Sequence, residues 1–292
     1  MEAIETRGLT KDYGSGRGIF DLDLAVHPGE AFGFLGPNGA GKTTTIKLLM
    51  GLIRATAGSA SIFGLDCGRD AVAVKQRVGY VPGELPQWGG WRGGQVVAYV
   101  GGLRGRLDRD TVDAVASRLQ LDLGRRYREY SSGNKHKLAL VLAFMHGPQL
   151  LVLDEPTSGL DPLHQQVFDQ LVGEARAGGA TVFLSSHVLS EVEHVCDRVG
   201  IVREGRLVTV SSITDLARLR AHRINIQFGD EPPLERLRAL DGLEALTADG
   251  RRVTAMMRGG FEPLMAILAG HRILAFESRE PSLEEIFLSF YR

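Results

Sequence analysis

The segment AFGFLGPNGAGKTTTIKLL, residues 31–49, joins a short apolar run, a glycine-rich stretch and a run with apolar residues at helical spacing. This order predicts a buried parallel strand, a loop and a helix. Gly36 and Gly41 bracket the pattern GxxxxGK[ST], which Lys42 and Thr43 complete. Glycines let backbone N–H groups approach an anion closely, and the following helix adds the positive end of its dipole. The segment therefore predicts a cradle for the phosphates of a nucleotide.

Three side chains of this loop have distinct expected contacts. Lys42 is expected to reach the β- and γ-phosphates, and the Thr43 hydroxyl is expected to bind Mg²⁺. Thr44 is expected to touch the next phosphate inward. The complete set of predicted nucleotide contacts in the loop is Gly36, Pro37, Asn38, Gly39, Ala40, Gly41, Lys42, Thr43 and Thr44. A glycine-rich turn that binds nothing is the alternative, and the full match between a strand and a helix disfavours it.

Composition narrows the class of protein. The chain has 292 residues, enough for one large domain and a smaller one, and its 43% hydrophobic and 24% charged residues are ordinary for a globular protein. A formal net charge of −1 argues against a dedicated nucleic-acid binder. The two cysteines, Cys67 and Cys196, lack metal-like spacing and fit a reduced, cytosolic compartment. The N-terminus does not read as a signal peptide, and the longest apolar run, residues 138–145, is far shorter than the ~20 residues that span a bilayer.

A second motif, LLVLDEPTSGLDP at residues 150–162, begins with an apolar run typical of a buried strand. Asp154, at its end, is placed to hold Mg²⁺, directly or through water, and Glu155 is placed to polarise an attacking water. Farther along, His187 follows the predicted strand TVFLSS, residues 181–186. The ends of such strands are where ligand sites of α/β sheets gather. Together with the phosphate loop, these residues indicate an ATPase site.

The segment YSSGNKHKL, residues 130–138, precedes the Asp154 strand and carries the most specific resemblance. It is similar to the signature sequence LSGGQ of the nucleotide-binding subunits of ATP-binding-cassette (ABC) transporters. The four matching positions are Ser131, Ser132, Gly133 and Asn134, of which Ser132 and Asn134 are substitutions that keep small or amide character. Other phosphate-loop families lack this segment together with SGLDP and the later histidine. The matching motifs occur in family order over residues 1 to about 210.

The resemblance implies further roles. Tyr13 would stack on adenine, His187 would contact the γ-phosphate, Glu155 would be the catalytic base, and Asp161 would communicate across a dimer. One position departs from the family: in VPGELPQW, residues 81–88, Gly83 stands where a glutamine that reaches Mg²⁺ and couples to the membrane subunit is usual. Glu84 or Gln87 could replace it. Glu84 has a suitable carboxylate for Mg²⁺, and the alternative is that it faces solvent.

The predicted fold class is α/β: a P-loop NTPase core with an antiparallel β layer and a helical arm, plus a small α+β C-terminal domain. The ATPase domain is placed at residues 1–211, with its arm at about 88–145, and the second domain at 212–292. Three strands, at 222–228, 251–257 and 272–278, and helices at 235–240 and 261–270 are expected in the second domain. Ser282 and Glu285 form a capping-box pattern for a closing helix. Such tails are found in the exporter branch of the family.

The chain has one phosphate loop and one signature segment, which in the family meet only across a head-to-tail pair. The resemblance therefore implies a partner ATPase, either a second copy or a paralogous subunit, and integral membrane permease subunits that receive the work. The predicted function is to energise an exporter of a drug, antibiotic, lipid or polysaccharide, with ATP and Mg²⁺, from the cytoplasmic face of the membrane. The alternative is a soluble ABC ATPase acting on nucleic acid or ribosomes. Those relatives generally carry paired cassettes or long coiled-coil insertions, neither of which this chain shows, so no nucleic acid is expected.

Overall fold

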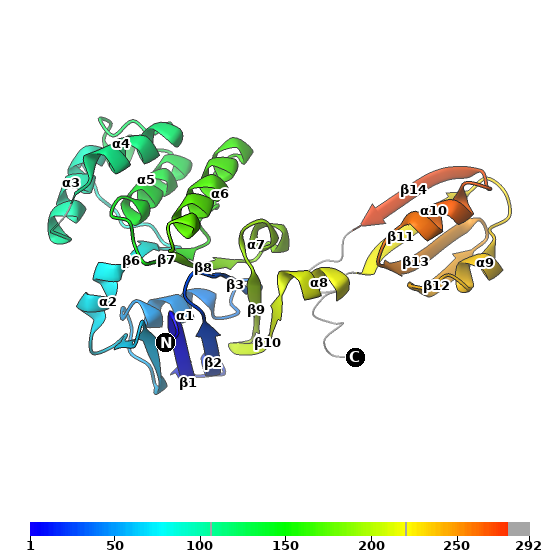
Figure 1. The fold of residues 1–292 in the computed structure, drawn as a ribbon, viewed down its shortest axis with the longest axis horizontal. Helices are drawn as coiled ribbons and strands as arrows, with labels where there is room; N and C mark the ends of the chain where they lie inside the picture. Colours follow the sequence, from blue (N-terminus) through cyan, green and yellow to red (C-terminus); the bar gives the residue numbers. More distant parts are fainter. Residues whose placement is uncertain (106, 220, 280–292) are drawn as a thin grey trace. The chain divides into compact units, whose positions relative to one another are not determined.

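The computed structural model describes residues 1–105, 107–219 and 221–279, and the chain divides into two compact units, Met1–Ser211 and Ser212–Arg292. Figure 1 shows the elements of each unit in chain order. The first unit carries the motifs discussed above, and the second carries none of them. Each unit has its own hydrophobic core.

The first unit is built on a six-stranded sheet with the order β10-β9-β3-β8-β7-β6. Its central strands β3 (Ala31–Leu35), β8 (Thr181–Ser186) and β7 (Leu150–Asp154) are buried along their whole length. Strands β6 (Val78–Val81), β7, β8, β3 and β9 (Arg198–Arg203) pair in parallel, and β10 (Arg206–Ser212) lies at the edge. Parallel strands covered on both faces need continuous apolar sequence, which explains the runs seen in these segments.

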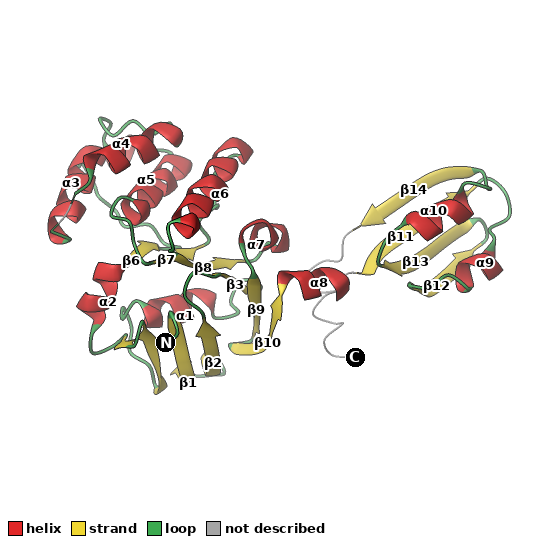
Figure 2. Cartoon of the chain, in the orientation of Figure 1, coloured by secondary structure: helices red, strands yellow, loops and turns green. Residues whose placement is uncertain are grey.

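A four-stranded antiparallel sheet forms a second layer. It consists of β1 (Ile4–Asp12), β2 (Gly18–Val26), β4 (Ala57–Ile62) and β5 (Leu65–Asp66), in the order β2-β1-β4-β5. Helix α1 (Lys42–Leu49) lies between the two sheets, because its Ile46 and Leu49 join a core with side chains from both (Figure 2). Helix α2 (Ala71–Arg77) leads into β6. The phosphate-loop helix is therefore held by packing on two sides.

The remaining helices of this unit include the predicted arm. Helices α3 (Gly93–Leu103), α4 (Arg109–Arg118) and α5 (Ser132–Phe144) are followed, after β7, by α6 (Pro162–Ala177) and α7 (Leu189–Val195). Among the described residues, no helix combines the length and the apolar character needed to cross a membrane.

The second unit contains α8 (Ile213–Leu219), β11 (Ala221–Phe228), α9 (Leu234–Arg238), β12 (Leu243–Asp249), β13 (Arg252–Arg258), α10 (Glu262–Leu268) and β14 (Ile273–Arg279). From β11 onward the elements run β-α-β-β-α-β, and the antiparallel order β12-β13-β11-β14 is that of the ferredoxin-like arrangement. Ile224, Ile226 and Phe228 alternate along β11 and pack with the helices in one core. The predicted fold class is confirmed: a parallel α/β core, an antiparallel layer and a small α+β unit.

Two elements of the second unit differ from the sequence prediction. The sheet has four strands where three were expected, since β12 was missed, and helix α8 was not foreseen. Within β12 the register shifts between Glu244 and Thr247, and Ala245 has a φ of 52°, so the apolar alternation that marks a strand is interrupted. The predicted capping box at Ser282 and Glu285 lies outside the described residues.

Candidate functional site

The phosphate loop forms an open helix N-terminus. Gly41, immediately before α1, has a φ of 107°, and no side chain of the described residues caps the helix there. The first N–H groups of α1 are consequently free to bind an anion. A Cβ atom at Gly41 would lie 2.6 Å from the Ile19 side chain, so packing and backbone conformation both require glycine.

Lys42 is buried within this loop. Its Nζ donates to the carbonyl oxygens of Gly36 at 2.6 Å and Pro37 at 3.3 Å. The same Nζ lies 3.2 Å from Oε1 of Glu155. The carboxylate of the second motif and the lysine of the first therefore meet directly, although they are more than a hundred residues apart in sequence.

The sheet order explains this meeting. Strands β3, β8 and β7 are parallel neighbours, so the loops that follow them converge at one edge of the sheet. Glu155, directly after β7, has a φ of 50°, a conformation that a glutamate rarely adopts. Its Oε2 lies 2.7 Å from Nδ1 of His187, which follows β8. Glu155 thus bridges Lys42 and His187.

Asp154 lies beside this group and is completely buried. Its Oδ1 accepts a hydrogen bond from Oγ of Ser185 at 2.6 Å, whereas Oδ2 has no hydrogen-bond partner among the described residues. Burying a carboxylate oxygen without a hydrogen-bond partner costs free energy. Such an oxygen is a suitable ligand for a hard cation. A Cβ atom at Gly83 would lie only 2.8 Å from that oxygen. Any larger residue at position 83 would therefore require the Asp154 carboxylate to shift.

Glu84 and Gln87 are both exposed to solvent. Burial, reinforced by the negative charges of Asp154 and Glu84, raises the pKa of Tyr80 to about 12, so both carboxylates lie near that ring. Gln87 is exposed, and its Nε2 donates to the Leu85 carbonyl at 3.5 Å. Within the ranges that the structure describes, no group of three or more His, Cys, Asp or Glu side chains is arranged to hold a metal ion.

A cavity of about 490 Å³ opens over the phosphate loop. It is lined by Tyr13, Gly16, Arg17, Gly18, Pro37, Asn38, Gly39, Gly41, Lys42, Thr43, Thr44, Glu155 and Glu204. Tyr13 is half exposed, so one face of its ring is available for stacking, and Lys11 Nζ lies 5.4 Å from the ring centroid. Arg17 and Glu204 were not singled out from the sequence, because they belong to no recognisable motif.

The signature residues 131–134 lie at the start of α5. Ser131 caps α5, and its Oγ accepts from the Asn134 backbone N–H at 3.2 Å. A Cβ atom at Gly133 would lie 2.7 Å from the Gly159 carbonyl oxygen, so the start of α5 packs against the SGLD loop. Among the described residues that line the cavity over the phosphate loop, none comes from 131–134. Asp161 caps α6, and its side chain is 56% exposed.

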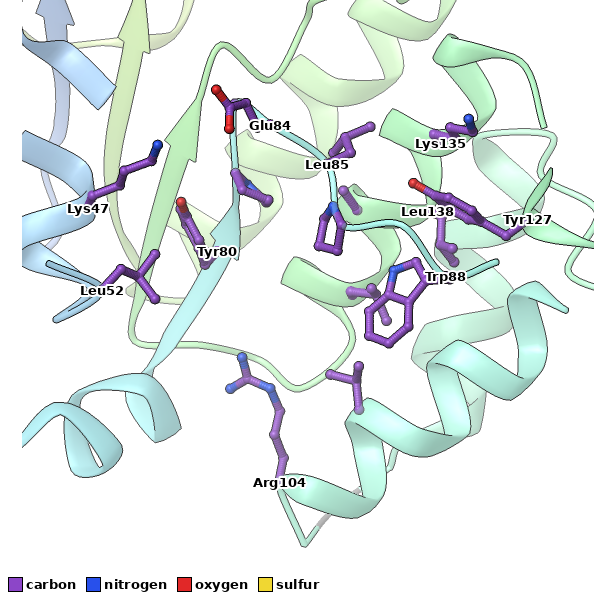
Figure 3. A pocket seen from close by; sticks show the side chains of 16 residues that line it. Lys47, Leu52, Tyr80, Glu84, Leu85, Trp88, Arg104, Tyr127, Lys135 and Leu138 are labelled. Carbon is purple, nitrogen blue, oxygen red and sulfur yellow. The ribbon is translucent and has the colours of Figure 1, made fainter. Parts of the chain in front are cut away.

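A second, more apolar pocket of about 410 Å³ adjoins Glu84 (Figure 3). Leu52 and Tyr80 lie on one side of it, and Trp88 and Leu138 lie on the other. Arg104 lies at its base, where its guanidinium group donates to the backbone carbonyls of Lys75 and Val78. This pocket was not predicted from the sequence, since its walls come from separate segments of the chain.

The fold and site together define an ATPase of the ATP-binding-cassette class. A family model described as ABC transporter matches residues 19–158. The chain is 36% identical to the bacitracin transport ATP-binding protein BcrA of Bacillus licheniformis, over 78% of this chain and 76% of that protein. It is also 29% identical to the linearmycin resistance ATP-binding protein LnrL of Bacillus subtilis, over 98% and 97% of the two chains. The chain belongs to the ATP-binding subunits of ABC transporters.

Solved structures agree with this assignment. A structure described as the ATP-binding subunit of an ABC transporter superposes with a TM-score of 0.68 at 28% identity and covers 74% of this chain and 92% of its own. A bacterial Atm1-family ABC exporter with ATP bound gives a TM-score of 0.65 at 25% identity, over 75% of this chain and 40% of that one. The family resemblance, the binding of ATP and the ATPase activity predicted from the sequence are confirmed.

Proposed function

We propose that this chain energises a membrane exporter by closing, with ATP, into a head-to-tail dimer. The observation that carries this proposal is the division of the site. Lys42 and Glu155 line one cavity and His187 contacts Glu155, while the described signature residues that begin with Ser131 are not among those that line it. A complete site then requires the signature of a partner ATPase, either a second copy or a paralogous subunit.

The contacts support specific roles in the phosphate-loop cavity. Tyr13 stacks on the adenine, the loop from Gly36 to Thr44 binds the phosphates, and Lys42 contacts the β- and γ-phosphates. Glu155 serves as the general base for the attacking water, and His187 contacts the γ-phosphate. In the closed dimer, the signature residues Ser131, Ser132, Gly133 and Asn134 contact the partner's ATP, and Asp161 communicates between the two sites.

Thr43 and Asp154 would hold Mg²⁺ beside the bound phosphates. The unpartnered Oδ2 of Asp154 supports this assignment, because it supplies a buried, negatively charged oxygen of the kind that Mg²⁺ binds. When bound, the metal ion neutralises charge on the phosphates. Glu84 is a further candidate through water, since it shares the surroundings of Tyr80 with Asp154.

The pocket beside Glu84 supports the membrane partnership. It is lined mainly by apolar side chains and opens next to Gly83, at the position where the family couples to its membrane subunit. We assign it to a segment of an integral permease, which would hold the chain on the inner face of the membrane. The named relatives act in bacitracin transport and linearmycin resistance, and these names favour an antibiotic or another drug as the exported substrate.

Purification of the tagged full-length chain from detergent-solubilised membranes of its native host tests this function. The proposal predicts that an integral membrane protein co-purifies and that the Trp88→Ala variant, whose side chain lines the apolar pocket, loses it while keeping ATP binding. Recovery of the chain without any membrane protein, combined with ATPase activity that nucleic acid stimulates, would contradict the proposal and favour the soluble alternative.

A further inference from the structure

A buried polar contact joins the signature helix α5 to the start of α6. Nζ of Lys137 lies 2.8 Å from Nε2 of His164, and both residues are only 8% exposed. Lys137 follows the signature residue Ser131 on α5, and His164 lies in the first turn of α6. Burying a lysine is unfavourable unless its charge has a partner, so this contact is a specific feature of the packing between the two helices.

His164 also contacts Asp161. Its Nδ1 lies 2.7 Å from Oδ2 of Asp161, and its backbone N–H donates to Oδ1 at 3.1 Å. An ammonium group can only donate, so Nε2 of His164 accepts from Lys137, and Nδ1 carries the proton donated to Asp161. These hydrogen bonds from His164, the backbone one first, lower the pKa of the Asp161 carboxyl group. The three side chains thus form one directed chain, Lys137 to His164 to Asp161.

The loop from Glu155 to Asp161 is also held by side-chain hydrogen bonds near its other end. Oγ1 of Thr157 donates to Oε1 of Glu191 at 2.7 Å, and Oγ of Ser186 donates to Oε2 at 2.5 Å. Ser186 directly precedes His187, which contacts Glu155. The loop from Glu155 to Asp161 is therefore tied at one end to the hydrolytic group and at the other to the signature helix.

We infer that Lys137 and His164 are positioning residues that set the Asp161 side chain according to the position of the signature helix. This inference rests on the proposed function, in which the signature helix closes on the partner's nucleotide and Asp161 communicates between the sites. A hydrophobic pair of similar size would fill the same space at a lower cost of desolvation. The buried cation instead fixes the direction of the His164 hydrogen bonds and, through them, the orientation of Asp161.

Steady-state ATPase kinetics of Lys137→Met and Lys137→Arg, each also combined with Asp161→Ala, test the inference. Methionine keeps the aliphatic bulk but cannot donate, whereas arginine keeps a cationic donor. We expect Lys137→Met to lower kcat about tenfold with little change in KM, and Lys137→Arg to keep most of the activity. Because residues of one network are not additive, Lys137→Met should cause no further loss in the Asp161→Ala background.

Arg118→Met is the matched control. Arg118 on α4 pairs with Glu174 on α6 at 2.6 Å, so it also links the arm to α6, but at the end of the helix away from Asp161. We expect it to leave kcat unchanged. Thermal unfolding identifies any variant that fails to fold, and if Lys137→Met does so, His164→Gln takes its place in the same double-mutant cycle.

The outcomes separate this inference from the proposed function. Wild-type ATPase activity and ATP-dependent dimerisation of Glu155→Gln are measured first, and loss of both would contradict the proposed function. If both hold, a Lys137→Met variant with wild-type kcat, or one whose loss adds fully to that of Asp161→Ala, would overturn the positioning role.

Discussion

Glu155 contacts two other residues of the proposed hydrolytic site. Its two carboxylate oxygens contact Lys42 at 3.2 Å and His187 at 2.7 Å. A bound γ-phosphate competes with the Glu155 carboxylate for Lys42 and His187, since it carries more charge than the carboxylate. Binding of ATP is thus expected to free Glu155 to orient an attacking water.

The Lys42→Ala substitution removes the charge that faces the β- and γ-phosphates. A charge-assisted hydrogen bond contributes about 1.5–3 kcal/mol, so ATP affinity should fall by roughly 10- to 100-fold. A titration with a fluorescent ATP analogue measures this loss. The melting temperature should change little, because Lys42 contacts backbone carbonyls of its own loop and not the core; wild-type affinity would contradict the assigned contact.

Glu155→Gln keeps the size of the side chain but removes the basic carboxylate. Loss of a general base typically lowers the rate by about 10²–10⁴-fold, whereas ATP should still bind and hold the dimer closed. Single-turnover hydrolysis together with size-exclusion chromatography in ATP measures both effects. Unchanged turnover would shift the catalytic role away from Glu155, with His187 the next candidate.

Gly83→Ala tests why the expected glutamine is missing. A Cβ atom at this position would lie 2.8 Å from the unpartnered oxygen of Asp154, so the carboxylate has to move. If that oxygen serves Mg²⁺, the metal concentration for half-maximal ATPase activity should rise by about tenfold or more. The same Mg²⁺ dependence in the variant and the wild type would argue against Asp154 as the metal site.

At the scale of elements, the central strand β8 pairs with β3, which precedes the phosphate loop, and with β7, which precedes Glu155. Phe183 is completely buried there and stacks on Phe32 of β3 with ring centroids 6.0 Å apart. Phe183→Ala should therefore destabilise the chain by about 3–5 kcal/mol in urea unfolding. Val72→Ala, at a side chain 75% exposed on α2, should change stability by less than about 0.5 kcal/mol. Equal stabilities of the two variants would contradict this view of the core.

Sequence patterns identified the buried strands that are apolar along their whole length. The runs at 31–35, 150–154 and 181–186 became strands β3, β7 and β8, because a strand covered on both faces must be apolar throughout. Strand β12 was missed because its bulge at Ala245 breaks the alternation. The bridge from Lys137 through His164 was also not predicted, since a lysine and a histidine 27 residues apart form no motif until α5 and α6 pack together.

The reason why Gly83 stands in place of the family glutamine could also not be predicted from the sequence. The sequence marked Gly83 as a departure, but the reason lies in the distance between its backbone and Asp154, which no local pattern encodes. Arg17 and Glu204 likewise reach the nucleotide cavity only because β1, β2 and the β9–β10 turn surround the phosphate loop. These contacts depend on tertiary packing and could not be read from the chain.

At the scale of the whole molecule, two chains share each site in the proposed dimer. Lys42 and the proposed base Glu155 line the phosphate-loop cavity, whereas Ser131, which caps the N-terminus of α5, is not among the described residues that line it. A helix N-terminus of this kind favours an anion, which in the proposed dimer is the γ-phosphate of the partner's ATP. ATP then acts as the ligand that biases the equilibrium between the open and closed dimer.

Mixing two inactive variants tests this claim most directly. Lys42→Ala and Ser131→Arg are each expected to be inactive as homodimers. In a head-to-tail mixed dimer, one site combines both defects and the other combines two intact halves. ATP-dependent co-purification through different tags on the two chains confirms that mixed dimers form. We predict that the mixture regains ATPase activity, up to about one site's worth in the mixed fraction. Mixed dimers that form but remain inactive, or chains that never pair in ATP, would contradict the shared head-to-tail site.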